Sequence, residues 1–289
     1  LMLALLSLCL VLLYPTILAS SMKIAIVTGA NKGIGLEIAK KLCQGGCKTI
    51  MACRNESLGE NAAADLQKLG FDTEFRQLDI SDENSIHNFV RGMQNDYSTV
   101  DILVNNAAIA FKGSDPTPFQ LQAAPTMKPN YFGTLLLIEA MLPLLRLSAS
   151  PRLVNVASMA GHLRTMKSKQ LQQQFCSDSL TIPELSQLMR QFVIDVENGV
   201  HNDKGWSNSC YGMSKLAVIA LTRILARQET HPTMRINCCC PGWCATDMSS
   251  HSGQRTAEQG ARTPSMLALA LADDGATGKF FSDEREVTW

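Results

Sequence analysis

Short runs of apolar residues alternate with amphipathic segments along most of the chain. The apolar runs predict β-strands at residues 23–28, 48–53, 74–79, 100–105, 152–157, 234–239 and 278–281. The segments between them predict helices at residues 34–44, 58–69, 84–95, 123–147 and 209–228. Strands that are apolar throughout must be covered on both faces, so this order predicts an α/β fold with a doubly wound parallel sheet.

Residues 159–208 interrupt the alternation. They contain a glutamine run at 172–174 and an amphipathic pattern at 182–200, which predict a helical insertion before the helix at 209–228. No proline- or serine-rich linker and no internal repeat divides the chain. Residues 22–289 are therefore expected to form one domain.

Residues 1–21 carry no charge, and 16 of them are apolar. Three interpretations are open: a signal peptide, a membrane anchor, and an extension outside a working protein that starts at Met22. We favour the third, because a core strand begins almost directly after this leader. A glycosylation sequon at Asn55 falls in a loop expected to face a cofactor, which favours a cytoplasmic protein over a secreted or membrane-anchored one.

The composition narrows the classes of function. The 26 basic and 26 acidic residues cancel, so no basic excess offers itself to a nucleic acid. Aromatic residues make up 6%, which is few for a stacking platform. Three of the ten cysteines are consecutive, at 238–240, and are expected to be buried reduced thiols. Since no His/Cys cluster has zinc spacing, no metal is expected.

A glycine-rich turn, Thr-Gly-Ala-Asn-Lys-Gly-Ile-Gly, occupies residues 28–35, between the first predicted strand and helix. Glycines permit a tight turn, and the helix N-terminus then offers N–H groups to a pyrophosphate. The turn therefore predicts a Rossmann-type dinucleotide site. The residues expected to contact the cofactor here are Gly29, Asn31, Lys32, Gly33, Ile34 and Gly35.

The charges near this turn favour NADP over NAD. A NAD site places a carboxylate at the end of the second strand, but this chain has Arg54 there. Arg54 and Lys32 are both positioned to meet a 2′-phosphate. Asp79, at the end of the third strand, is expected to accept from the adenine amino group, and Ile80 to flank the ring.

Tyr211 and Lys215 are spaced i and i+4, which places them on one face of a helix. A nearby ammonium favours the phenolate and so lowers the pKa of a tyrosine. Ser158 ends a predicted strand, and carboxyl ends of parallel strands are where open α/β sheets bind ligands. Together these residues predict proton transfer beside a bound dinucleotide.

With these residues the chain resembles the short-chain dehydrogenase/reductase superfamily, and within it the monomeric NADPH-dependent carbonyl reductases. The resemblance covers nearly all of residues 22–289. Besides the glycine turn, Ser158 and the Tyr211/Lys215 pair, the matching segments are residues 78–80, 101–107, 115–119, 126–130 and 241–248.

The resemblance implies NADPH-dependent reduction of quinones, aldehydes and ketones. Tyr211 would be the general acid for the carbonyl oxygen, and Ser158 would donate a hydrogen bond to that oxygen. Lys215 would hold the nicotinamide ribose and lower the pKa of Tyr211. Asn130 would anchor a water that relays protons to Lys215. The alternatives are a steroid or prostaglandin carbonyl dehydrogenase/reductase, and a catalytically quiet NADP-binding sensor.

The other matching residues would bind the cofactor or the substrate. Those expected at the adenosine ribose, the nicotinamide and the phosphates are Asn106, Ala107, Pro241, Gly242 and Thr246. Trp243 and Met248 would give a small-molecule carbonyl substrate an apolar wall. The insertion resembles helices that cover the pairing surface in monomeric members, so a monomer is implied.

Two positions depart from the family pattern. Ala108 stands where a glycine is usual, and Pro129 directly precedes Asn130. A proline there removes one helix N–H, so we expect it to change the kink that presents Asn130. Neither departure removes a reacting group.

Overall fold

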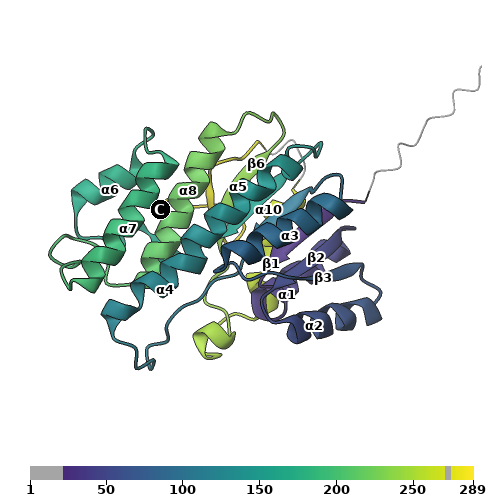
Figure 1. Ribbon diagram of the computed structural model, residues 1–289, viewed down its shortest axis with the longest axis horizontal. Helices are drawn as coiled ribbons and strands as arrows, with labels where there is room; N and C mark the ends of the chain where they lie inside the picture. The colour runs from purple at the N-terminus through teal and green to yellow at the C-terminus, as the bar shows by residue number, and fades with distance from the viewer. Residues whose placement is uncertain (1–21, 271–274) are drawn as a thin grey trace, which may run out of the picture.

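The computed structural model describes residues 22–270 and 275–289, which form a three-layer α/β fold around one sheet (Figure 1). The sheet has the order β3-β2-β1-β4-β5-β6-β7-β8. Its strands are β1 (Ile24–Thr28), β2 (Lys48–Cys53), β3 (Thr73–Gln77), β4 (Ile102–Asn105), β5 (Arg152–Val156), β6 (Arg235–Cys240), β7 (Phe280–Ser282) and β8 (Arg285–Glu286). All neighbouring pairs are parallel except β7 with β8, which is antiparallel and was not predicted.

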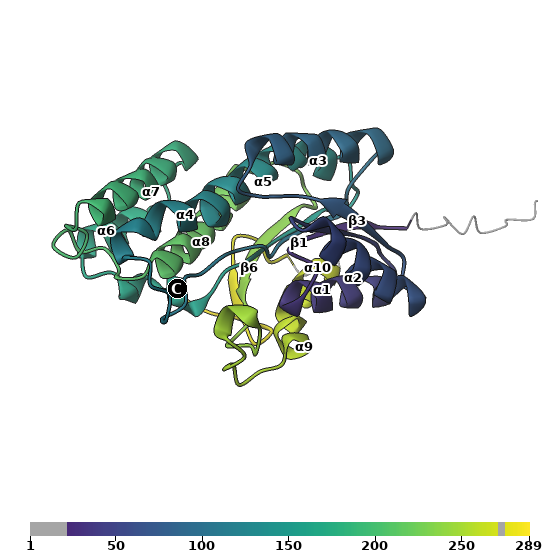
Figure 2. The same cartoon turned by 60° about the horizontal axis from the view of Figure 1, so that its bottom comes forward.

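Helices cover both faces of the sheet (Figure 2), and alternate residues of β1 face opposite layers. Ala25 and Val27 pack in the core cluster of α1 (Gly33–Gln44), α2 (Glu56–Lys68) and α10 (Arg262–Leu269). Ile26 points the other way, into the cluster of α3 (Glu83–Asp96), α5 (Thr134–Leu145) and α8 (Cys210–Gln228). Both faces are thus covered, and the predicted doubly wound sheet is confirmed.

The predicted helix at 123–147 is wrong as a single element. It divides into α4 (Ala123–Met127), a π-helical segment η2 (Lys128–Gly133) and α5. Pro129 has no N–H to donate to the preceding turn, so the regular ladder cannot continue through it. At the other end of η2, a Cβ on Gly133 would lie 1.7 Å from the Ile80 carbonyl oxygen, so only glycine permits this close approach.

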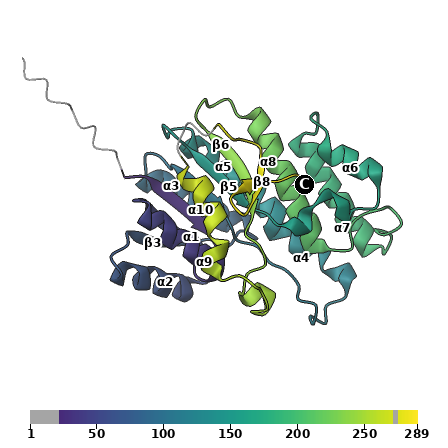
Figure 3. The ribbon, with the colours of Figure 1, turned by 180° about the vertical axis from the view of Figure 1, so that it is seen from behind.

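The insertion forms two short 3₁₀ turns, η3 (Met159–Gly161) and η4 (Leu163–Thr165), and the helices α6 (Lys169–Cys176) and α7 (Ile182–Glu197). Helix α7 packs against α4 and α8 (Figure 3). Asp195 of α7 is buried and accepts from Trp206 Nε1 at 2.8 Å and Lys204 Nζ at 2.6 Å. These bonds close the end of the insertion onto α7.

The predicted leader, residues 1–21, lies outside the described residues. Within the described ranges, no helix is both long enough and apolar enough to cross a membrane. The three consecutive cysteines, Cys238, Cys239 and Cys240, are buried in β6 and unbridged, as expected, whereas Cys176 is exposed at the end of α6.

Candidate active site

The glycine-rich turn joins β1 to α1 and adopts the tight geometry expected from its sequence. Gly29 and Gly33 have φ of 66° and 57°, a region that favours glycine. A Cβ on Gly35 would lie 2.2 Å from the Gly29 carbonyl oxygen. The turn is therefore closed on itself, and α1 starts at Gly33 with free N–H groups at its N-terminus.

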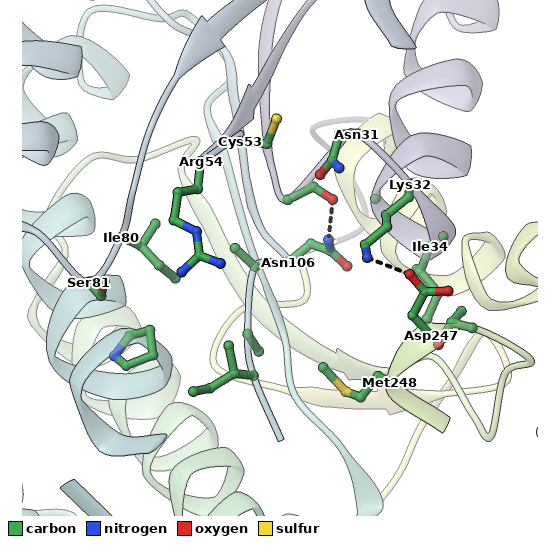
Figure 4. A pocket seen from close by; sticks show the side chains of 18 of the residues that line it. Asn31, Lys32, Ile34, Cys53, Arg54, Ile80, Ser81, Asn106, Asp247 and Met248 are labelled. Atoms are coloured by element: carbon green, nitrogen blue, oxygen red, sulfur yellow. Dashed lines mark hydrogen bonds and ion pairs between the residues drawn. The ribbon is translucent and has the colours of Figure 1, made fainter. Parts of the chain in front are cut away.

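A cavity of about 650 Å³ opens beside this turn, at the carboxyl ends of the central strands (Figure 4). This size lies in the range of cofactor pockets. Most of the residues predicted to bind the cofactor line it: Gly29, Asn31, Lys32, Gly33, Ile34, Gly35, Arg54, Asp79, Ile80, Asn106, Ala107 and Thr246. The lining does not include Pro241, Gly242, Tyr211 or Lys215.

The cavity also contains residues that sequence reasoning gave no role. Cys53, Pro125, Lys128, Asp247 and His251 are among them. Asp247 belongs to the Thr-Asp-Met segment at 246–248. The sequence motif indicates that this segment lies at the site, but it does not indicate that the Asp247 carboxylate pairs with a lysine of the cavity. Pro125 lies in α4 and Lys128 in η2, and both line the cavity because the helix predicted at 123–147 is divided there. The apolar periodicity does not reveal this division.

Lys32 and Arg54 reach into the cavity from two sides (Figure 4). The Lys32 ammonium lies 2.5 Å from Asp247 Oδ2, so it is engaged by a carboxylate from a distant segment. Arg54 is exposed and forms no ion pair with another described residue. Of the two cations predicted to bind a phosphate, Lys32 is therefore already paired with a carboxylate, whereas Arg54 is not paired with any described acid.

The side of the cavity that is expected to bind the adenine is partly held by internal hydrogen bonds. Asp79 lies beyond the end of β3, and its Oδ1 accepts from Ser81 N at 2.8 Å and from Ser81 Oγ at 2.6 Å. Asn106 donates from Nδ2 to the Thr28 carbonyl at 2.9 Å. Asn106 therefore braces the glycine turn as well as lining the cavity.

Ser158 and Tyr211 come together because two glycines let η3 lie against α8. A Cβ on Gly161 would be 2.5 Å from the Leu216 nitrogen, and one on Gly212 would be 2.8 Å from the Ala160 carbonyl. Ser158 follows β5, caps η3 and forms a side-chain hydrogen bond with Tyr211. Ser158 and Tyr211 therefore lie next to each other, between the end of β5 and the start of α8.

Lys215 lies one helical turn after Tyr211, with its Nζ 5.7 Å from the centre of the tyrosine ring. It is buried and donates to the Val156 carbonyl at 2.7 Å. Burial lowers the pKa of Lys215 to about 8. In this position the ammonium bridges α8 and the end of β5.

The expected low pKa of Tyr211 is wrong in this structure. Burial, with a smaller contribution from neighbouring Cys240, raises the pKa of Tyr211 to about 12, although the hydrogen bond with Ser158 acts to lower it. Burial disfavours the phenolate more strongly than its polar neighbours favour it. Tyr211 accordingly keeps its proton at neutral pH.

Asn130 is buried in η2, and its side-chain amide is fully engaged. Its Nδ2 donates to the Ile109 carbonyl at 2.9 Å and to Ser214 Oγ at 3.0 Å, while Oδ1 accepts from Ile109 N at 2.8 Å. Asn130 thus joins the loop after β4 to the helix that carries Tyr211 and Lys215. The side chain is therefore a bridge between two walls of the site.

The two residues predicted to meet the substrate are separated. Met248 lines the cavity and is 39% exposed. Trp243 does not line it; its indole N–H donates to the Ser252 carbonyl at 3.2 Å, and the side chain is 58% exposed. Within the described residues, no group of three or more His, Cys, Asp or Glu side chains is placed to hold a metal ion.

The sheet, the glycine turn and the Ser158–Tyr211–Lys215 group define a dinucleotide-binding α/β oxidoreductase. Residues 23–169 match the short chain dehydrogenase family, and residues 198–274 match the family described as Enoyl-(Acyl carrier protein) reductase. The chain belongs to the short-chain dehydrogenase/reductase family, as the sequence motifs predicted.

Related proteins are similar over nearly the whole chain. The chain is 43% identical over 280 residues to Carbonyl reductase [NADPH] 1 of Mus musculus, which covers 94% of this chain and 100% of the relative. Carbonyl reductase [NADPH] 3 of Mus musculus is 42% identical with the same coverage. The solved structure of salutaridine reductase from Papaver somniferum has a TM-score of 0.82 at 30% identity and covers 90% of this chain and 99% of its own.

Proposed function

We propose that the protein reduces carbonyl compounds to alcohols with NADPH. The observation that carries this proposal is the Ser158–Tyr211–Lys215 group at the strand ends, beside a cavity lined by a glycine turn and by the cations Lys32, Arg54 and Lys128. Its similarity to NADPH carbonyl reductases, at 42–43% identity over nearly the full length, supports the same reaction.

The cavity fits NADP rather than NAD. The tight glycine turn brings the N-terminus of α1 to the cavity, where its N–H groups can hold a pyrophosphate, and Lys32 and Arg54 supply positive charge for a further phosphate. Asp79 is the acid nearest the adenine end, and one of its oxygens is already engaged by Ser81. NADPH, when bound, supplies the hydride for reduction.

Residues of the chain donate the proton and orient the carbonyl oxygen of the substrate. Tyr211 holds its proton at neutral pH and donates it from its hydroxyl to the oxygen of the substrate. Ser158 orients that oxygen through its hydroxyl. Lys215 places a positive charge beside the Tyr211 ring, which stabilises the phenolate left after proton donation. Asn130 holds the loop after β4 against α8 and so keeps these groups in register.

Apolar side chains surround the approach to this group. Ile109, Met159 and Met248 are each more than a third exposed, and Met159 directly follows Ser158. An apolar rim of this kind favours uncharged carbonyl compounds such as quinones, aromatic aldehydes and ketones, and it discriminates weakly among them. Steroid carbonyls, which are uncharged, and prostaglandin carbonyls, whose long apolar chains also bear a carboxylate, are the alternative substrates.

We also propose that the protein is a cytoplasmic monomer. Helix α7 of the insertion packs on α4 and α8, and the insertion resembles the helices that cover the pairing surface in monomeric members of the family. Sedimentation of the purified chain at several concentrations tests the oligomeric state, and a mass that rises with concentration contradicts the proposal.

The decisive test is NADPH consumption by the purified chain with a panel of quinones, aldehydes, ketones, steroids and prostaglandins. We expect turnover with the uncharged aromatic carbonyls and a much slower rate when NADH replaces NADPH. Binding of NADPH without turnover of any carbonyl would instead favour the sensor. The Tyr211→Phe variant controls for reduction by contaminating enzymes.

A further inference from the structure

Lys32 is the cation of the glycine turn, yet its ammonium is already paired inside the cavity. It lies 2.5 Å from Oδ2 of Asp247, a residue 215 positions away along the chain. Both side chains line the same cavity (Figure 4). A phosphate that approaches Lys32 must therefore displace or share this carboxylate, which carries the same sign of charge as the phosphate.

Asp247 is held in place independently of Lys32. Its Oδ1 lies 3.0 Å from His251 Nε2, and it begins the 3₁₀ turn η5 (Asp247–Ser249). Ser250 and His251 follow with φ of 51° and 59°, a left-handed backbone that side chains disfavour. The His251 N–H fixes this bend by donating to the Thr246 carbonyl at 2.9 Å. The carboxylate therefore stays at the cavity when the lysine moves away.

Arg54 offers the contrast within the same cavity. Its guanidinium is exposed and has no ion-pair partner among the described residues. A 2′-phosphate would therefore meet Arg54, which has no acidic partner among the described residues, and Lys32, which is already paired with Asp247. The binding free energy gained from Lys32 is reduced by the interaction that Lys32 loses.

We propose that Asp247 is a specificity-determining residue that competes with the 2′-phosphate of NADPH for Lys32 and so limits the preference for NADPH over NADH. This inference rests on the proposed function, because it requires that NADPH bind in this cavity. It predicts that removing the Asp247 charge increases discrimination between the two cofactors.

The test measures equilibrium dissociation constants for NADPH and NADH in the wild type and in Asp247→Asn. Exposed ion pairs are modest, so we expect Asp247→Asn to bind NADPH about two- to fivefold more tightly. NADH should change less, so the ratio of the two constants should rise. In a Lys32→Met background, Asp247→Asn should no longer change that ratio.

Glu258→Gln is the matched control, because Glu258 is an exposed acid that also pairs with a lysine, the half-buried Lys41 at 3.7 Å, but does not line the cavity. It should leave both dissociation constants unchanged. Weaker or unchanged NADPH binding by Asp247→Asn, or equal tightening of both cofactors, overturns the inference. Failure of the wild type to bind NADPH at all overturns the proposed function itself.

Discussion

The Tyr131 hydroxyl lies 2.9 Å from Ser186 Oγ, so a buried hydrogen bond joins the insertion to the π-helical segment that holds Asn130. Next to it, the Arg190 guanidinium of α7 lies 5.4 Å from the centre of the Phe132 ring. Successive residues of η2 therefore contact the insertion on one side and the site on the other. The insertion thus supports the site as well as covering a surface.

Tyr131→Phe tests this support. Loss of the hydroxyl should lower the free energy of unfolding by about 0.5–1.5 kcal/mol and should also lower kcat, because Asn130 is the next residue. Tyr97→Phe is the control: it removes a tyrosine hydroxyl outside the site, one that follows α3 and donates to Glu74 of β3 at 2.6 Å. Denaturant unfolding and steady-state kinetics on both variants show whether the Tyr131 hydroxyl supports catalysis as well as stability. An unchanged kcat in Tyr131→Phe would limit the bond to a structural role.

Tyr211→Phe tests the proton donor. The substitution keeps the ring over Lys215 but removes the hydroxyl, so carbonyl reduction should fall by about 10²- to 10⁴-fold. NADPH binding, followed by its fluorescence on titration, should remain close to that of the wild type. Full turnover by the variant would exclude Tyr211 as the general acid.

The pH dependence should follow Lys215. Below its pKa of about 8 the ammonium is charged and can stabilise the phenolate; above that pH it is neutral and this support is lost. Tyr211 keeps its proton until about pH 12, so it does not account for a loss near pH 8. We therefore expect kcat/KM for reduction to fall as the pH rises through about 8. A profile that stays flat to strongly alkaline pH would contradict this assignment.

Gly35→Ala tests the closed glycine turn. The added methyl group would lie 2.2 Å from the Gly29 carbonyl oxygen and 2.5 Å from Asn106 Nδ2, so the turn must open. We expect a loss of about 1–3 kcal/mol in stability and weaker NADPH binding. Gly113→Ala is the matched control, since a Cβ there meets nothing within 4 Å. Equal behaviour of the two variants in thermal melting and NADPH titration would refute a special role for Gly35.

Local patterns predicted the features that depend on neighbouring residues. The apolar runs located the main strands because central strands such as β4 and β5 are buried on both faces, and the glycine spacing located the turn because a Cβ at Gly35 would collide with it. The i, i+4 spacing of Tyr211 and Lys215 likewise gave their common helix face. These relations are contained within a few residues of sequence.

Features that depend on distant segments were not predicted. The Lys32–Asp247 pair joins two loops whose approach only the folded chain defines. The high pKa of Tyr211 reflects burial, which the sequence near residue 211 does not reveal. Pro129 was noted as a departure, but the π-helical turn also needed the contact between Gly133 and Ile80.

The buried thiols of β6 allow transient opening of the protein core to be measured by chemical labelling. Cys238, Cys239 and Cys240 become reachable by an alkylating reagent only when the centre of the sheet separates, whereas Cys176 is reachable at all times. The rate at which β6 is labelled, relative to Cys176, therefore measures how often the core opens. Slower labelling with NADPH present would show that cofactor binding protects this buried strand from opening.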